Sequence, residues 1–160
     1  KCSHPRLAAQ IFEGIKLSRN FYNDVSQDTD VFITKVKDYF RVSLSSPNRK
    51  KALMAFKDMD QTNTRLDFNI LEQWMVNNLP KITLYSGWSK VAMNIEGEII
   101  KYVMLKGVYE EKVVLPIHDA IAVKLEDAEW GAKTMHEAWG EVMGEDYCEV
   151  DIDYPNNSRA

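Results

Sequence analysis

The chain has 160 residues, 45% of them hydrophobic and 28% charged, with a net charge of −4. This composition is typical of one globular domain with a sizeable core. No apolar run approaches the roughly 18 residues of a membrane span, and the N-terminal residues lack the apolar segment of a signal peptide. Cys2 and Cys148 lack the spacing of zinc ligands, so we expect free thiols, with a terminal disulfide as the alternative. We therefore expect a cytoplasmic, intracellular protein with no membrane partner.

Helices dominate the predicted elements. Apolar residues at helical spacing predict six of them, over about residues 4–13, 30–44, 49–58, 68–79, 88–107 and 126–143. Asp30 is a suitable N-cap for the second helix. Gly14, Gly107 and Gly144 stand where helices are expected to end. Residues 18–29 are polar and turn-prone, so we expect no regular structure there.

A basic stripe lies in the first half of the chain, although the net charge argues against whole-surface attraction to nucleic acid. Its members are Lys35, Lys37, Arg41, Arg49, Lys50, Lys51 and Lys57. A lysine-rich helix face is most often simply solvated, so no single Lys is diagnostic. The loop that follows, residues 58–69, alternates oxygen-bearing side chains like the start of a calcium loop. Asn63 replaces the Gly and Asn69 the Glu that such a loop needs, which argues against calcium.

The most informative stretch is Val113 to Leu125, in which two short apolar runs flank His118-Asp119. The runs are rich in β-branched residues and predict a β-hairpin with the His-Asp pair at its turn. A carboxylate on a tight turn between two buried strands would be desolvated and rigid, which suits a ligand of a divalent cation. Asp is also common in turns for turn chemistry alone, so both interpretations stay open at this point.

The C-terminal part completes the predicted fold. Residues 147–154 alternate apolar and polar side chains, as in a half-exposed strand that could join the hairpin in a sheet of at least three antiparallel strands. The order of helices, hairpin, helix and strand predicts an α+β fold, with a small antiparallel sheet packed against helices. We expect a single domain over residues 1–160.

A metal phosphohydrolase is one interpretation of the His-Asp pair. Such enzymes place a His, a His-Asp pair and a later Asp around metals, and His4, His118-Asp119 and Asp151 or Asp153 occur in that order. That scaffold requires the pair on a helix, which Pro116 and the β-branched runs disfavour. His136 lies in an amphipathic helix and is expected to be a surface or packing residue.

Taken together, several segments resemble the fingers and palm of family A DNA polymerases and related single-subunit polymerases, especially the divergent copies in phages and mobile elements. The matching segments are His4-Pro5-Arg6, Tyr22, the helix with Lys37, Phe40 and Leu44, Tyr85-Ser86-Gly87, the helix from Asn94 to Ile100, Leu115-Pro-Ile-His118-Asp119 and the closing strand. The resemblance implies fingers-like helices over residues 30–80 and a palm portion over 85–160. It also implies that the chain is a C-terminal fragment of a longer polymerase.

By this resemblance the chain is part of a template-dependent nucleotidyltransferase that uses Mg²⁺ or Mn²⁺, nucleoside triphosphates and a primer-template, alongside other replication proteins. Asp119 would bind catalytic metal, and His118 would lie near the primer terminus. Lys37 would contact the incoming triphosphate, with Lys35 and Arg41 as weaker phosphate contacts. Such chemistry needs two carboxylates around a metal pair and cations for the triphosphate.

The chain also departs from the family pattern. Ile33 stands where an Arg usually precedes the Lys by one turn, and Ser45 stands near the position of an expected Tyr-Gly. The Asp of the first polymerase motif would be expected a few residues before His4, which leaves the sequence with half of a metal site. The second hypothesis is therefore a non-catalytic nucleic-acid-binding replication module with the same fold.

Overall fold

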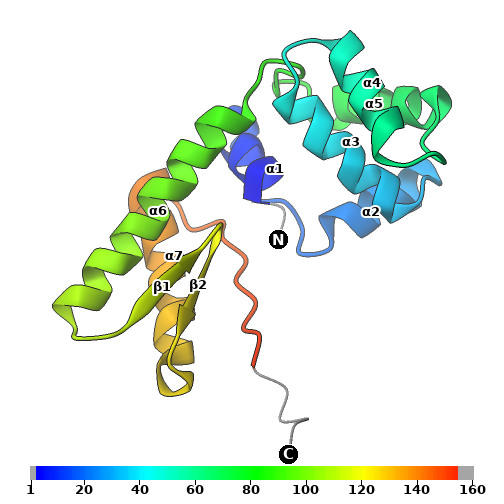
Figure 1. Ribbon diagram of the computed structural model, residues 1–160. Coiled ribbons are helices and arrows are strands. Elements are labelled where there is room, and N and C mark those ends of the chain that lie inside the picture. Colours follow the sequence, from blue (N-terminus) through cyan, green and yellow to red (C-terminus); the bar gives the residue numbers. More distant parts are fainter. Residues whose placement is uncertain (1–2, 155–160) are drawn as a thin grey trace, which may run out of the picture. The chain divides into compact units, whose positions relative to one another are not determined.

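The computed structural model describes residues 3–154 and has an α+β fold (Figure 1). Helices make up most of it, and two short antiparallel strands pack against helices. The chain divides into two compact units, and the boundary between them along the chain falls between Met93 and Asn94, within α6 Ser89–Tyr109. We refer to them as the helical unit, up to Met93, and the hairpin unit, from Asn94 onward. None of the described helices is long and apolar enough to cross a membrane.

The helical unit contains the elements that precede the hairpin. They are α1 Ser3–Ala8, the π-helical turn η1 Ala9–Glu13, α2 Phe21–Thr29, α3 Ile33–Ser45, α4 Arg49–Met59, α5 Arg65–Asn78 and the first residues of α6 Ser89–Tyr109. The predicted helices are present, but α6 continues past Gly107, where its end was expected, to Tyr109. Gly14 ends η1 in the left-handed conformation (φ +70°) that glycine adopts without strain.

The prediction of an irregular segment over residues 18–29 is wrong, because α2 occupies most of it. Phe21 and Val25 lie one turn apart on α2 and are buried. The ring of Phe21 packs edge-to-face on Phe40 of α3, with centroids 5.0 Å apart. Tertiary packing of one apolar edge therefore overrides the polar composition of α2. Asp30 is the left-handed residue that follows α2 (φ +54°) rather than the N-cap of α3.

An aromatic cluster forms the core of the helical unit. Tyr39, Phe56 and Phe68 come from α3, α4 and α5, and each is fully buried or nearly so. Their rings meet edge-to-face, with centroids 5.1 Å apart for Tyr39 and Phe68 and 5.6 Å apart for Phe56 and Phe68. This geometry aligns ring edges with ring faces, which adds to the apolar area that the three helices bury.

A polar network fixes the loop between α5 and α6. Arg49 donates hydrogen bonds to both carboxylate oxygens of Glu72, and the hydroxyl of Tyr85 donates to the same carboxylate at 2.5 Å. The backbone of Tyr85, in the left-handed region (φ +57°), donates to the carbonyl of Ser43 at the end of α3. Burial raises the pKa of Glu72, but the hydrogen bonds from Arg49 and Tyr85 outweigh it and hold the pKa below its ordinary value. The ionised carboxylate therefore ties α4, α5 and this loop together.

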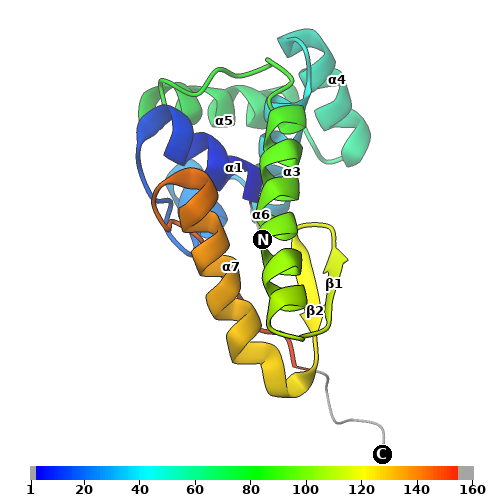
Figure 2. The ribbon, with the colours of Figure 1, turned by 90° about the vertical axis from the view of Figure 1, so that its left-hand side faces the viewer.

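The hairpin unit contains the rest of α6, strands β1 Val114–Ile117 and β2 Ala120–Val123, the 3-10 turn η2 Leu125–Asp127 and α7 Ala128–Met143. Figure 2 shows the hairpin, α6 and α7 as neighbouring elements. Two glycines allow the close approach. A Cβ on Gly107 of α6 would lie 2.5 Å from a methyl group of Val114, and one on Gly131 of α7 would lie 3.3 Å from Val123. The hairpin therefore rests on two helices at positions where a larger side chain would crowd it.

The strand pairing explains why Pro116 is tolerated. Ile117 pairs with Ala120 across the two-residue turn, and Pro116 pairs with Ile121. Because hydrogen-bonded and non-hydrogen-bonded pairs alternate from the turn, Pro116 occupies a non-hydrogen-bonded position. Its missing N–H faces the outer edge of β1, where no ladder bond is lost. The predicted hairpin is therefore confirmed, with His118-Asp119 as its turn.

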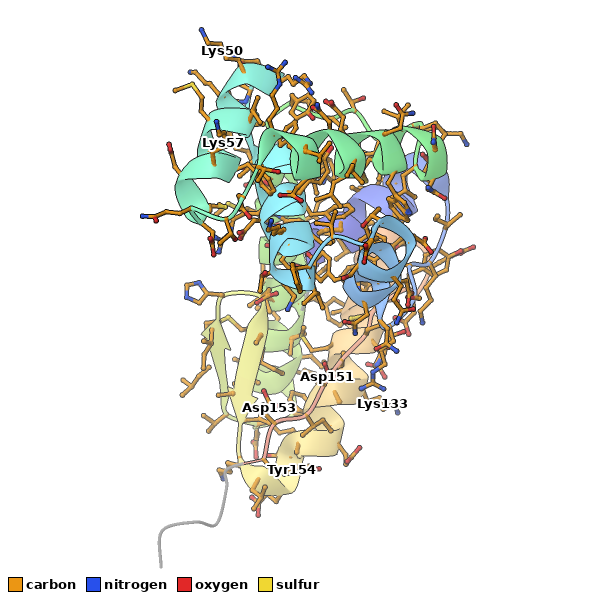
Figure 3. The ribbon with its side chains drawn as sticks, turned by 90° about the vertical axis from the view of Figure 1, so that its right-hand side faces the viewer. Lys50, Lys57, Lys133, Asp151, Asp153 and Tyr154 are labelled. Atoms are coloured by element: carbon orange, nitrogen blue, oxygen red, sulfur yellow. The ribbon has the colours of Figure 1, made fainter. Side chains whose placement is uncertain are left out.

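The predicted C-terminal strand is wrong, since the described part of residues 147–154 has no strand and the sheet has two strands. This segment runs beside β2 in both Figure 1 and Figure 3 without forming a ladder. Side chains hold it instead: Asp146 accepts from the backbone N–H of Cys148, and the hydroxyl of Tyr154 donates to Glu129. Cys148 is buried and forms no disulfide with another described residue, and Cys2 lies outside the described residues.

Candidate functional site

The hairpin turn combines an exposed His-Asp pair with an uncommon backbone conformation. His118 has φ +54°, and Asp119 is not among the residues with positive φ. Positive φ at the first central position only is the feature of a type II′ turn, which normally has glycine there. A non-glycine residue in this region is strained. Both side chains are exposed, so the turn presents an imidazole and a carboxylate to solvent side by side.

The strands beside the turn are more exposed than the sequence predicts. Leu115 and Ile117 keep 59% and 53% of their surface accessible, and Asp119 itself is exposed. The expectation of a desolvated carboxylate between two buried strands is therefore wrong. Only the opposite face of the hairpin, with Val114 and Val123, packs against the glycines of α6 and α7. The face with Val114 and Val123 therefore anchors the hairpin to the helices, and the face with Leu115 and Ile117 is an apolar surface exposed to solvent.

A divalent metal needs more ligands than this turn supplies. Asp119 offers one carboxylate, and a two-metal site requires at least two. Within residues 3–154, no group of three or more His, Cys, Asp or Glu side chains is placed to hold a metal ion. The described residues therefore do not fit a complete Mg²⁺ or Mn²⁺ site, and no metal-dependent step follows from them alone.

Helix α3 presents two of the expected phosphate contacts on one face. Lys37 and Arg41 are one turn apart, and both are exposed. The ammonium of Lys37 lies 6.0 Å from the centroid of the Tyr22 ring, so the aromatic face of α2 steadies it. Neither side chain has an acidic partner among the described residues. Both cations are therefore open to an anionic ligand.

Lys35, by contrast, is engaged in the fold. Its ammonium donates to the carbonyl of Thr62 at 2.7 Å and to the carboxylate of Asp67 at 2.8 Å. Asp67 is also the capping-box residue of α5, where it accepts from the backbone of Thr64. Burial raises the pKa of Asp67, but the bonds from Lys35 and Thr64 hold it below the ordinary value. The pair stabilises the start of α5, which leaves Lys35 poorly placed to contact a triphosphate.

The structure thus gathers the predicted residues into two pairs. His118 and Asp119 share one turn of the hairpin unit, and Lys37 and Arg41 share one face of a helix in the helical unit. Each pair is exposed and set by local structure, the first by a hairpin and the second by helical periodicity. Sequence reasoning could find both because each depends on residues that are close in the chain.

The two other sites weighed from the sequence gain no support. The His-Asp pair lies on a hairpin turn rather than on the helix that a phosphohydrolase scaffold requires. In the calcium-like loop, Asp60 accepts from the backbone N–H of Thr62, which lowers the pKa of Asp60. Asn63 is buried and donates to the carbonyl of Phe56. Asp60 stabilises the turn, and Asn63 ties the loop to α4, so neither contact indicates a cation site.

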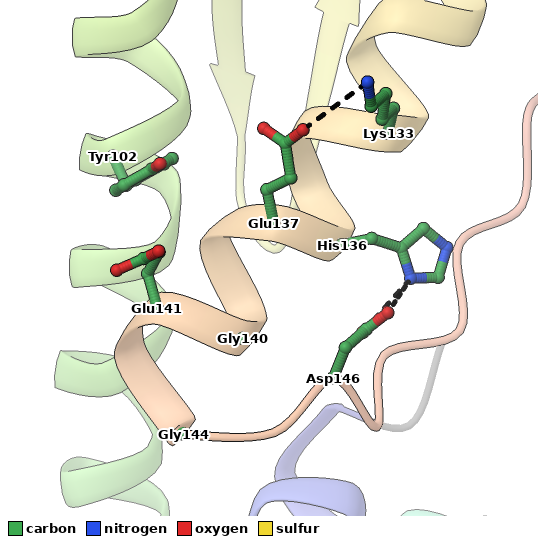
Figure 4. Close-up of a pocket in the computed structure, with 8 residues that line it drawn as sticks. All are labelled: Tyr102, Lys133, His136, Glu137, Gly140, Glu141, Gly144 and Asp146. Atoms are coloured by element: carbon green, nitrogen blue, oxygen red, sulfur yellow. Dashed lines mark hydrogen bonds and ion pairs between the residues drawn. The ribbon is translucent and has the colours of Figure 1, made fainter.

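One pair was not found from the sequence. Nδ1 of His136 lies 2.9 Å from a carboxylate oxygen of Asp146, in a cavity of about 520 Å³ that Tyr102, Glu137 and Glu141 also line (Figure 4). The signal was Gly144, whose left-handed conformation (φ +83°) reverses the chain and brings Asp146 back beside α7. The pair fastens the C-terminal segment to α7, consistent with the predicted surface role of His136.

Comparisons with protein-family models, with curated proteins and with solved structures give no significant match. The residues of this chain alone therefore indicate its function. The exposed His118-Asp119 turn is the most informative of them, because it combines an uncommon backbone conformation with an imidazole and a carboxylate.

Proposed function

We propose that this chain is part of a template-dependent nucleotidyltransferase of the DNA polymerase type, with the His118-Asp119 hairpin at its reaction centre. The observation that carries the proposal is the left-handed backbone of His118 at a turn position that favours glycine. Strain of this kind persists where the side chain serves a purpose that glycine cannot. An exposed imidazole beside an exposed carboxylate is suited to contact the end of a nucleic-acid strand and an incoming triphosphate.

The remaining roles follow from the exposed groups. Asp119 would contribute one metal ligand, and His118 would donate a hydrogen bond to the primer end. Lys37 would neutralise charge on the triphosphate, with Arg41 one turn away on the same face. The other metal ligands must come from residues beyond the described pair. Lys35 has no part in this proposal because Asp67 already binds it.

Primer extension by the full-length protein tests the proposal, with Asp119→Asn as the main variant. Loss of a metal ligand removes several kcal/mol of transition-state stabilisation, so we expect the rate to fall more than about a hundredfold. The matched control is Asp153→Asn, an exposed acid in the same unit, which should leave the rate unchanged. Extension that survives Asp119→Asn would contradict the mechanism. If the protein hydrolyses phosphate esters instead and needs Asp153, the phosphohydrolase interpretation replaces it.

A second candidate function is a non-catalytic nucleic-acid-binding module of the replication machinery in the cytoplasm. Two observations favour it: Ile33 stands where the polymerase pattern has Arg, and the described residues lack a complete metal site. Here the full-length protein would bind a primer-template with no extension. The unmodified protein would then already fail to extend a primer, which separates this function from the first.

A further inference from the structure

The solvent side of α4 is a basic face that the fold does not use. Helix α4 buries Ala52 and Phe56 against the core, while Lys50, Lys51 and Lys57 are exposed. Figure 3 shows Lys50 and Lys57 projecting from α4 into solvent. We call these three lysines the α4 lysine face. We propose that this face binds the phosphodiester backbone of a nucleic acid.

The three charges are uncompensated, in contrast to the neighbouring basic residues. Arg49 on the same helix is held by Glu72 at 2.6 Å, and Lys35 on α3 is held by Asp67. No ion pair or hydrogen bond joins a side chain of the α4 lysine face to any residue between 3 and 154. The fold therefore gains nothing from these charges and leaves all three ammonium groups free for a ligand.

Their position is also unfavourable for the helix itself. Lys50 and Lys51 lie in the first turn of α4, and that turn contains no acidic residue. The N-terminal end of a helix carries partial positive charge, which repels cations and attracts anions. Adjacent like charges add to the repulsion. A sequence that places lysines where the helix disfavours them, without a compensating contact, is expected at a functional surface rather than a structural one.

The spacing suits a phosphate backbone. Lys50 and Lys57 are seven residues apart, which is about 10 Å along a helix with a rise of 1.5 Å per residue. Seven residues are about two helical turns, so the two lysines lie on the same side of α4, and a flexible single strand can place phosphates beside both. The two ends of the α4 lysine face can therefore contact phosphates of one strand at the same time.

Charge distribution favours a polyanion over a protein partner. Residues 2–93 contain thirteen Lys and Arg against nine Asp and Glu, whereas residues 94–160 contain six against fifteen. The positive balance thus belongs to the helical unit. Met54 is the one large apolar side chain exposed on α4 between the lysines, with 57% of its surface accessible. Protein interfaces have an apolar, aromatic centre, which this face lacks.

The inference deepens the proposed function, because such a surface would hold the primer-template, but its test does not require catalysis. The full chain is titrated into a fluorescent single-stranded oligonucleotide at several salt concentrations, and binding is followed by anisotropy. The variant is Lys50→Gln with Lys57→Gln. The control is Lys81→Gln with Lys90→Gln, two exposed lysines of the same unit that give the same net charge.

Each lysine that contacts a phosphate of a single strand contributes about 0.7 to the slope of log K against log salt. We expect the slope of the α4 variant to fall by about 1.4, with affinity about 25-fold weaker at 0.1 M salt. The control should match the unmodified chain, and Lys50→Arg with Lys57→Arg should restore most of the binding. Circular dichroism verifies that each variant keeps its helices.

Three results would overturn the inference. The first is an α4 variant that binds like the unmodified chain, and the second is an equal loss in both double variants, which would indicate net charge alone. The third is equally tight, α4-dependent binding of a polyglutamate peptide, which would indicate an acidic protein partner. Binding through α4 by a full-length protein that extends no primer would refute the polymerase function and leave this inference intact.

Discussion

Replacing His118 with glycine separates the structural from the functional role of the hairpin turn. His118 has φ +54°, and its exposed side chain makes no hydrogen bond with the described residues. The left-handed region costs a non-glycine residue about 1–2 kcal/mol. Glycine also makes the unfolded chain more flexible, which lowers the free energy of unfolding by about 0.4–1 kcal/mol. His118→Gly should therefore leave the chain as stable as before, or more stable by up to about 1.5 kcal/mol.

The matched control is Asp119→Gly at the next position, where φ is not positive. Without strain to relieve, this change should destabilise by about 0.4–1 kcal/mol. Urea denaturation compares the midpoints of the three proteins, and amide hydrogen exchange at Leu115 and Ala122 reports on the hairpin itself. Primer extension should be lost in His118→Gly despite its unimpaired stability. If His118→Gly lowered the free energy of unfolding by more than about 1 kcal/mol, or kept full primer-extension activity, the strained backbone of His118 would not be explained by a function of its imidazole.

Three further predictions concern the fold around the site. Gly107→Ala should destabilise the hairpin unit by about 1–3 kcal/mol, because the new Cβ would lie 2.5 Å from a methyl group of Val114. Gly97→Ala on the same helix is the control: its Cβ would have no neighbour within 4 Å, so it should stabilise the unit by about 1 kcal/mol. The midpoints of urea denaturation compare the two variants. The lowered pKa of Glu72 contributes stability that is present above its ordinary pKa of about 4.5 and is lost as pH falls through the lower folded value. Glu72→Gln should therefore reduce the loss of stability at acid pH, measured by urea denaturation at several values between about pH 2 and 7. An unchanged loss of stability would assign acid unfolding to other groups. Lys35→Gln should lower the free energy of unfolding by about 1–2 kcal/mol, because Lys35 binds Asp67. Lys37→Gln should lower it by less than about 0.5 kcal/mol but weaken the binding of a nucleoside triphosphate. The reverse pattern would make Lys35 the ligand contact and Lys37 the structural residue.

The sequence predicted the elements whose signals are local. The hairpin was found from two β-branched runs around a polar pair, and α3 from apolar residues at helical spacing, because each pattern is complete within about thirteen residues. Helix α2 was missed because its apolar content is little more than Phe21 and Val25, and its stability comes from packing on α3. The C-terminal strand was overpredicted because alternation cannot tell a ladder from a segment held by the contacts of Cys148 and Tyr154.

Burial was harder to predict than secondary structure. The strands of the hairpin have the β-branched composition of buried strands, yet Leu115 and Ile117 face solvent in the described chain. Burial depends on which elements cover a face, and here α6 and α7 cover only the face that bears Val114 and Val123. Composition therefore indicated an apolar surface correctly, but it could not say that half of that surface is open.

The basic stripe looks uniform in the sequence, but the structure separates its members into residues with an acidic partner and residues without one. Lys35 and Arg49 form ion pairs with Asp67 and Glu72 on α5, which lie 32 and 23 residues away along the chain. No local pattern could reveal those partners, because helix packing brings them together. The other basic residues of the stripe are exposed and have no acidic partner in the described chain. They are Lys37, Arg41, Lys50, Lys51 and Lys57. The fold gains no ion pair from any of these five, so variants of each should change stability by less than about 0.5 kcal/mol, and a loss of ligand binding in them would separate a binding role from simple solvation.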